Sequence, residues 1–224
     1  MTSHGPPVPS LLVRGILFDC DGVLVDSLES VDRTWHRFAL ELGLDPAYVL
    51  TRHHGRPARE TIAEVAPHHD LDLAVEVLEN LEVGDSESVT ALPGAAQLLD
   101  CLPTGSWTVV TSATRRLAEV RLGAAGLPVP PTVVTADQVA NGKPNPEPYL
   151  TGATRLGLPP ETCVVFEDSR AGIVAGLAAG SLVVQVQAPH AEPHGEGVPL
   201  IADLRSVTPA VGADGMIVLG LRSA

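Results

Sequence analysis

Short apolar runs rich in β-branched residues recur along this chain, and segments with helical periodicity separate most of them. The runs cover residues 15–18, 107–110, 132–134, 163–166 and 182–186. Residues 115–125 and 147–156 instead repeat apolar positions every three to four residues. Strands that alternate with helices along a sequence build a parallel sheet with helices on both faces, so the pattern predicts an α/β fold.

The interval between the first two strands shows only helical periodicity and is too long for a simple crossover. Its first helix is predicted to begin with Asp26 as N-cap and to place Trp35 and Phe38 on one apolar stripe. Residues 57–66 and 70–81 carry two further helical patterns. The interval is therefore predicted to be an inserted helical cap.

These patterns divide the chain into a core and a cap. We expect the core to comprise residues 1–26 and 91–224 and the cap to comprise residues 27–90. The first 13 residues have neither the basic segment nor the long apolar segment of a signal peptide. We expect residues 1–13 to form a flexible extension and the protein to be cytoplasmic.

The C-terminal part of the pattern predicts one more helix and one more short strand. Gly172, Gly176 and Gly180 recur every fourth residue, which favours a helix packed closely on the sheet, with Ser169 as its N-cap. The strand is expected at residues 200–202. The pattern leaves the placement of the apolar residues 216–219 open.

Composition and charge narrow the possible functions. The chain has 224 residues, of which 45% are hydrophobic, so it can bury one core with an inserted subdomain. A net charge of -13 argues against nucleic acid and anionic membranes as partners, because an acidic surface repels both. The three cysteines lack the spacing of a zinc site or a disulfide framework. An anionic substrate would therefore need a local positive site.

Two carboxylates follow the first predicted strand directly. Asp19 and Asp21 stand two residues apart after the apolar run. Such a pair can supply a nucleophile and a proton-transfer group if a divalent cation offsets their mutual repulsion. The plainer interpretation is an Asp-rich turn that caps a strand.

Polar residues also follow the later strands, and ligands of open α/β sheets bind beyond the carboxyl ends of the strands. Thr111 and Ser112 follow the second strand, and Glu167 and Asp168 follow the fourth. Lys143, which follows the third, is the one lysine against thirteen arginines. A compact ammonium can approach a phosphoryl group and a carboxylate together. The set indicates metal-assisted attack on a phosphoryl group.

These segments resemble the four motifs of the haloacid dehalogenase superfamily of phosphohydrolases. The matching segments are residues 18–27, 109–112, 142–144 and 166–169. Their surroundings are similar to small sugar- and polyol-phosphate phosphatases, which include 2-deoxyglucose-6-phosphate, glycerol-phosphate and hexitol-phosphate phosphatases. The resemblance implies a Rossmann-like core with a helical cap. It also implies Mg²⁺-dependent hydrolysis of a small phosphorylated sugar or polyol by a monomer or homodimer.

The resemblance assigns a role to each matched residue. Asp19 would attack phosphorus to give an aspartyl-phosphate, while Asp21 would protonate the leaving hydroxyl and then activate water. Mg²⁺ would be bound by the Asp19 side chain, the Asp21 backbone carbonyl and Asp168. Glu167 would either bind the ion directly or orient its ligands. Lys143 would pair with the nucleophile and the transferring oxygens.

The resemblance further implies that the second motif binds phosphate through Ser112 and the backbone amide of Ala113. Thr111 is the alternative hydroxyl if the register differs by one residue. Three basic cap residues are candidates for recognising the substrate anion when the cap closes: His54, Arg56 and Arg59. A solvated turn between helices explains each of these three equally well.

Other enzymes of the superfamily differ from this chain at residues that their activities require. Dehalogenases lack the second aspartate, which is Asp21 here, and phosphonoacetaldehyde hydrolases use a cap lysine that this chain lacks. β-Phosphoglucomutases carry a histidine where this chain has Val31, so a sugar-phosphate mutase is the alternative ranked below a phosphatase. A non-catalytic binding protein of the same fold is a third hypothesis. The complete set of Asp19, Asp21, Lys143 and Asp168 argues against it.

Overall fold

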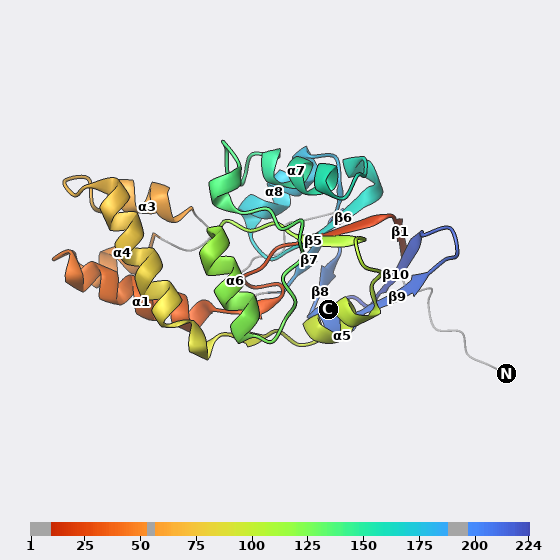
Figure 1. Ribbon diagram of the computed structural model, residues 1–224, viewed down its shortest axis with the longest axis horizontal. Helices are drawn as coiled ribbons and strands as arrows, with labels where there is room; N and C mark the ends of the chain where they lie inside the picture. The colour runs from red at the N-terminus through yellow and green to blue at the C-terminus, as the bar shows by residue number, and fades with distance from the viewer. Residues whose placement is uncertain (1–9, 53–56, 188–196) are drawn as a thin grey trace.

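A parallel sheet forms the centre of the molecule in the computed structural model, which describes residues 10–52, 57–187 and 197–224. Within these residues the sheet has the strand order β5-β2-β6-β7-β8 (Figure 1). The strands are β2 (Gly15–Phe18), β5 (Trp107–Val109), β6 (Cys163–Glu167), β7 (Leu182–Val186) and β8 (Leu200–Ile201). All four pairings between them are parallel, which confirms the predicted α/β fold.

Helices cover both faces of this sheet. They are α5 (Ala95–Cys101), α6 (Arg115–Ala124), α7 (Glu147–Arg155) and α8 (Arg170–Ala178). Phe18 packs with Leu122 of α6 on one face, and Leu17 packs with Tyr149 of α7 and Ile173 of α8 on the other. Figure 1 shows α7 and α8 above the sheet and α5 below it. Successive residues of a strand point to opposite faces, so the short run of β2 supports both layers.

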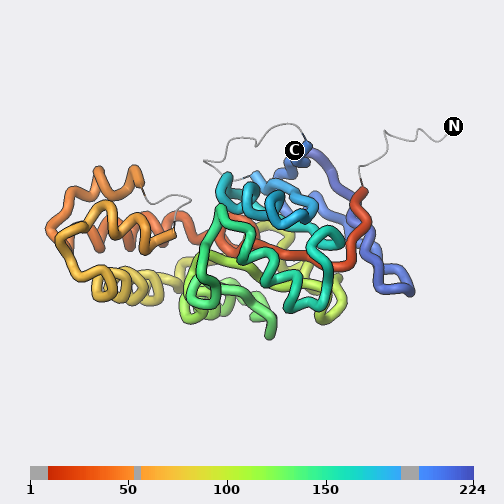
Figure 2. The backbone as a smooth tube through the Cα atoms, turned by 90° about the horizontal axis from the view of Figure 1, so that it is seen from above, coloured from red at the N-terminus to blue at the C-terminus, as the bar shows by residue number. Residues whose placement is uncertain are grey.

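A separate group of helices, here called the helical cluster, lies at one end of the molecule (Figures 1 and 2). It comprises α1 (Leu28–Glu41), α2 (Pro46–Leu50), α3 (Ala58–Val65) and α4 (Leu71–Gly84). The predicted stripe residues Trp35 and Phe38 pack with Ile62 and Leu78 in an apolar core of its own. The cluster joins the sheet through an antiparallel ribbon of β3 (Val25–Asp26) and β4 (Thr90–Ala91). The division into core and cap stays a prediction.

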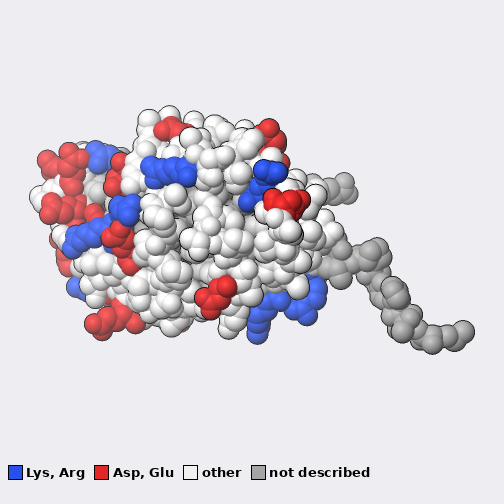
Figure 3. Space-filling model, turned by 45° about the vertical axis from the view of Figure 1, so that its right-hand side comes forward, with Lys and Arg blue, Asp and Glu red and all other residues white. Residues whose placement is uncertain are grey.

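The helical cluster also carries much of the acidic charge. Thirteen of the 27 acidic residues lie between residues 27 and 90, together with five arginines. Figure 3 shows charged side chains crowded over this end, while the rest of the visible face is mostly uncharged. Among the described residues, every helix is too short or too polar to cross a membrane.

A second, antiparallel sheet corrects one prediction and supplies a placement that the sequence pattern left open. Its strands are β1 (Ser10–Val13), β9 (Val207–Val211) and β10 (Ile217–Leu221), in the order β1-β10-β9. The expected flexible extension to residue 13 is therefore wrong for residues 10–13. Ile217 and Leu219 of β10 are buried in the same apolar core as Phe18 of the main sheet. Because β1 and β10 lie about 200 residues apart in the chain, no local pattern reveals their pairing.

Two further local predictions need correction. The run at residues 132–134 forms only a bridge between Val134 and Val110, because Pro130 and Pro131 before it offer no amide donor for a longer ladder. The N-cap of α1 is Ser27 and not Asp26, which pairs with Thr90 in the ribbon. The remaining short elements are the 3₁₀ helices η1 (Ser86–Ser88), η2 (Ala136–Gln138), η3 (Pro160–Thr162) and η4 (Leu204–Ser206).

Candidate functional site

Three carboxylates meet at the carboxyl edge of the sheet. The adjacent strands β2 and β6 are in register at Phe18 and Phe166, so Asp19 follows one strand and Glu167 ends the other. The Asp19 amide donates to the Phe166 carbonyl at 2.9 Å, which continues the ladder to the nucleophile candidate. One oxygen each from Asp19, Glu167 and Asp168 lies within 4.8 Å of the other two. The sheet thus brings together acids that are almost 150 residues apart in the chain.

Lys143 provides the positive charge in this cluster. Its Nζ donates to Asp19 Oδ1 at 2.5 Å, to Glu167 Oε1 at 2.7 Å and to the Val110 carbonyl at 3.0 Å. These three bonds use all three ammonium donors, and the residue is buried. The loop before Lys143 is tied to the start of α7, because the Glu147 carboxylate accepts from the amides of Ala140 and Asn141.

Glu167 is fixed on every side. Its Oε1 accepts from Lys143 and from the Tyr149 hydroxyl at 2.9 Å, and its Oε2 accepts from the amide and hydroxyl of Ser169 at 2.9 and 3.0 Å. The Ser169 hydroxyl also caps α8, as predicted, by accepting from the Gly172 amide. A fully buried carboxylate with four donors is satisfied without a metal ion.

Two glycines of α8 bear out the predicted close packing on the sheet, whereas Gly180 lies beyond the end of α8 and has no atom within 4 Å of an added Cβ, so the packing prediction is wrong for Gly180. A Cβ on Gly176 would lie 3.0 Å from Val183 and 3.3 Å from Val165, which agrees with close packing on the sheet. A Cβ on Gly172 would instead lie 1.5 Å from Glu167 Oε1. Because Glu167 is the last residue of β6, Gly172 also packs closely on the sheet, and its missing side chain makes room for the buried carboxylate.

The electrostatics of the cluster call for a cation. Burial, together with the charge of Glu167, raises the pKa of Asp19 to about 7 despite the opposing charge of Lys143. Burial, together with the charges of Glu167 and Asp19, raises the pKa of Asp168 to about 9. One ammonium faces three buried or half-buried acids, and oxygen donors are those that Mg²⁺ prefers. The donor set therefore fits this ion.

The Asp21 carboxylate has partners of its own outside this cluster. Its Oδ1 accepts from the Ser27 hydroxyl at 2.6 Å, so this N-cap side chain is not available to cap α1. Its Oδ2 lies 3.1 Å from Nη1 of Arg121, a residue that the sequence analysis missed. The sequence did carry a signal for this residue, because Arg121 is a charged residue at an apolar position of the helical pattern, between Leu117 and Leu122 on the buried face of α6.

The second motif offers one exposed hydroxyl and one engaged hydroxyl. Thr111 is buried, and its Oγ1 accepts from the Ala113 amide at 3.0 Å. Ser112 is exposed. This arrangement favours Ser112 over Thr111 as a phosphate ligand. The Ala113 amide, as it stands, donates within its own turn, and its part in phosphate binding stays a prediction.

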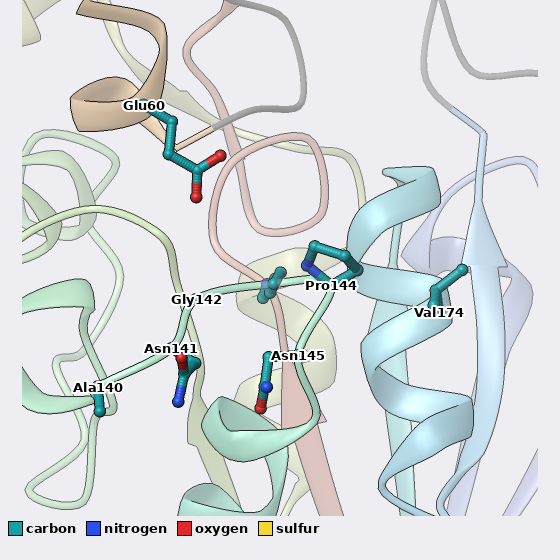
Figure 4. A pocket seen from close by; sticks show the side chains of 8 residues that line it. Glu60, Ala140, Asn141, Gly142, Pro144, Asn145 and Val174 are labelled. Carbon is teal, nitrogen blue, oxygen red and sulfur yellow. The ribbon is translucent and has the colours of Figure 1, made fainter. Parts of the chain in front are cut away.

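Of the three predicted cap residues, the structure describes only Arg59. His54 and Arg56 lie outside the described residues, and Arg59 is exposed and pairs with Asp72 at 2.6 Å. The neighbouring Glu60, which the sequence analysis missed, lines a cavity of about 510 Å³ together with Lys143 and other residues of its loop. Figure 4 shows Glu60 extending from α3 over this loop.

Comparisons with known proteins agree on one family. Residues 13–180 match the family model described as haloacid dehalogenase-like hydrolase. Hexitol phosphatase A of Escherichia coli K12 is 42% identical over 212 residues, which cover 92% of this chain and 98% of that protein. Glycerol-1-phosphate phosphohydrolase 2 of Saccharomyces cerevisiae is 36% identical and covers 79% of this chain and 76% of its own.

A solved structure points the same way. The crystal structure of a HAD family hydrolase from Deinococcus radiodurans R1, with bound phosphate and sodium, has a TM-score of 0.60 and 28% identity. The similarity covers 84% of this chain and 90% of that one. Sequence motifs, the parallel sheet and the relatives all lead to the same conclusion, that the chain belongs to the haloacid dehalogenase-like hydrolases.

Proposed function

We propose that this protein is a Mg²⁺-dependent phosphatase that hydrolyses small polyol or sugar phosphates through a covalent intermediate on Asp19. The observation that carries the proposal is the bond from the buried Lys143 ammonium to Asp19, in a cluster that also holds Glu167 and Asp168. The names of the relatives, a hexitol phosphatase and a glycerol-1-phosphate phosphohydrolase, support this substrate class.

In the first step, a carboxylate oxygen of Asp19 bonds to phosphorus while the bond from phosphorus to the polyol oxygen breaks. A proton held by Asp21 passes to the leaving oxygen, so the product leaves as a neutral alcohol. In the second step, water attacks phosphorus and gives a proton to Asp21. The bond from phosphorus to Asp19 breaks and phosphate is released.

Lys143 supports both steps by keeping positive charge beside the nucleophile and the transferring oxygens. Glu167 holds the Lys143 ammonium in place. We propose that this is its role, and that it is not a metal ligand, because each of its two oxygens already accepts two hydrogen bonds. Mg²⁺ would be held by the side chains of Asp19 and Asp168 and by the Asp21 backbone carbonyl. When bound, it supplies positive charge that offsets the carboxylates and the phosphoryl oxygens.

The cavity beside Lys143 suits a polyol tail. Its volume of about 510 Å³ lies within the usual range for small-ligand sites. Glu60 and Asn141 line it and can accept hydrogen bonds from hydroxyl groups, whereas a second phosphate would be repelled by the Glu60 carboxylate. We therefore expect neutral polyol monophosphates to be better substrates than bisphosphates.

The test is phosphate release from a panel of hexitol, glycerol, hexose and pentose phosphates with added Mg²⁺. We expect release from a few polyol or sugar phosphates by the wild type and by Asp100→Asn, a control at an exposed position of α5. Asp19→Asn and chelation should abolish it. Interconversion of hexose 1- and 6-phosphates without release would favour the mutase, and silence on every substrate would favour a non-catalytic role.

A further inference from the structure

We propose that Arg121 is a positioning residue for this reaction: it fixes the carboxylate of Asp21, and Glu82 of α4 in turn fixes Arg121. The inference rests on the proposed function, because it concerns the proton-transfer step assigned to Asp21. It adds a residue that lies outside the four sequence motifs and links the helical cluster to the chemistry.

Arg121 occupies a position where an apolar residue would be expected. Its side chain is only 5% exposed and lies on the face of α6 that buries Leu117 and Leu122. Its Nη1 lies 3.1 Å from Asp21 Oδ2 and its Nη2 lies 3.0 Å from Glu82 Oε1. The buried Nε has no hydrogen-bond partner among the described residues. A buried guanidinium is tolerated only when it is paired, so these two carboxylates account for its presence.

The two donors on Asp21 fix the orientation of its carboxylate. The Ser27 hydroxyl binds Oδ1 from the start of α1, and Arg121 binds Oδ2 from α6. Each carboxylate oxygen can accept a second hydrogen bond, so the group keeps free lone pairs for a proton-transfer partner. The Asp21 side chain is 30% exposed, which leaves it reachable by a substrate. A general acid must lie within hydrogen-bond reach of the leaving oxygen, and small errors in its placement slow proton transfer.

The contact between α4 and α6 contains a second polar pair that makes a matched control. Arg116 Nη1 donates to Asn80 Oδ1 at 2.8 Å, and the two residues lie on the same two helices as the pair formed by Arg121 and Glu82. Arg116 is exposed and bonds to Asn80, whereas the buried Arg121 also bonds to the Asp21 carboxylate. A loss of helix contact alone can thus be separated from a loss of Asp21 positioning.

The experiment compares two substrates that differ in their need for an acid. A polyol phosphate needs protonation of its leaving alkoxide, whereas 4-nitrophenyl phosphate releases a stable phenolate. For Arg121→Met we expect kcat/KM to fall about 10- to 100-fold on the polyol phosphate and less than about 3-fold on the aryl phosphate, with little change in KM. Arg121→Lys should recover part of the lost activity, and Arg116→Met should leave kcat/KM unchanged on both substrates.

Folding is controlled with a second variant. Arg121→Met leaves Glu82 buried without its partner, so the double variant Arg121→Met/Glu82→Met removes both charges and keeps the apolar volume. It should show the same selective loss on the polyol phosphate. Equal loss on both substrates, or the same loss in Arg116→Met, would overturn the positioning role. A wild type inactive on both substrates would refute the proposed phosphatase, which is a different result.

Discussion

Replacing Gly172 by alanine tests whether Glu167 is held as rigidly as its hydrogen bonds indicate. The new methyl carbon would lie 1.5 Å from Oε1 and 1.9 Å from Cδ of Glu167. Carbon atoms at van der Waals contact are about 3.5–4.0 Å apart, so the carboxylate or helix α8 must move by about 2 Å. A side-chain adjustment within the present network cannot absorb such a displacement.

The loss in the free energy of unfolding follows from the hydrogen bonds that this displacement breaks. Glu167 accepts bonds from Lys143, Tyr149 and Ser169, and a hydrogen bond to a charged group contributes about 1.5–3 kcal/mol. Losing two of them gives about 3–6 kcal/mol, a large part of the 5–15 kcal/mol by which a typical domain is stable. Lys143 would lose an anchor at the same time, so we expect activity to fall at least about 10-fold.

Urea denaturation of the metal-free protein measures the free energy of unfolding, and phosphate release measures activity. Gly123→Ala is the matched control, because this glycine lies in α6 with no atom within 4 Å of an added Cβ. We expect it to stabilise the protein by about 0.5 kcal/mol through helix propensity. If Gly172→Ala also unfolds within about 0.5 kcal/mol of the wild type and keeps its activity, the argument for a rigid Glu167 fails.

Two further predictions concern the same cluster. Tyr149→Phe removes one donor from the buried Glu167 and should lower the free energy of unfolding by about 1–3 kcal/mol in a urea titration; no change would show that this bond contributes nothing. Because the pKa values of Asp19 and Asp168 are raised to about 7 and about 9, the folded metal-free protein binds protons that the unfolded chain releases above about pH 4. The stabilising effect of these groups should thus be full below that pH and be lost as the pH rises to about 9. Melting curves in a chelator should show the wild type losing stability relative to Asp168→Asn as the pH rises over this range, because the asparagine does not titrate; a difference independent of pH would contradict the assignment.

Much of the candidate site could be predicted from the sequence, because parallel strands carry their carboxyl ends to one edge. Asp19, Lys143, Glu167 and Asp168 each follow a short apolar run or its loop, and the sheet needs only the order of these runs to bring them together. The stripe of α1, which includes Trp35, was predictable for a similar reason, since helical periodicity is a local property.

Other features depend on pairs that only the folded chain creates. The pairing of β1 with β10 and the contact of Arg121 with Asp21 join segments with no shared local signal. The Ser27 hydroxyl binds Asp21 instead of capping α1, and Gly172 makes room for the carboxylate of Glu167. The sequence by itself thus determined which residues gather at the candidate site, because residue types and the succession of strands along the chain are local properties. Tertiary structure decided how those residues are held, because hydrogen bonds and steric contacts depend on distances between parts of the chain that local patterns do not encode.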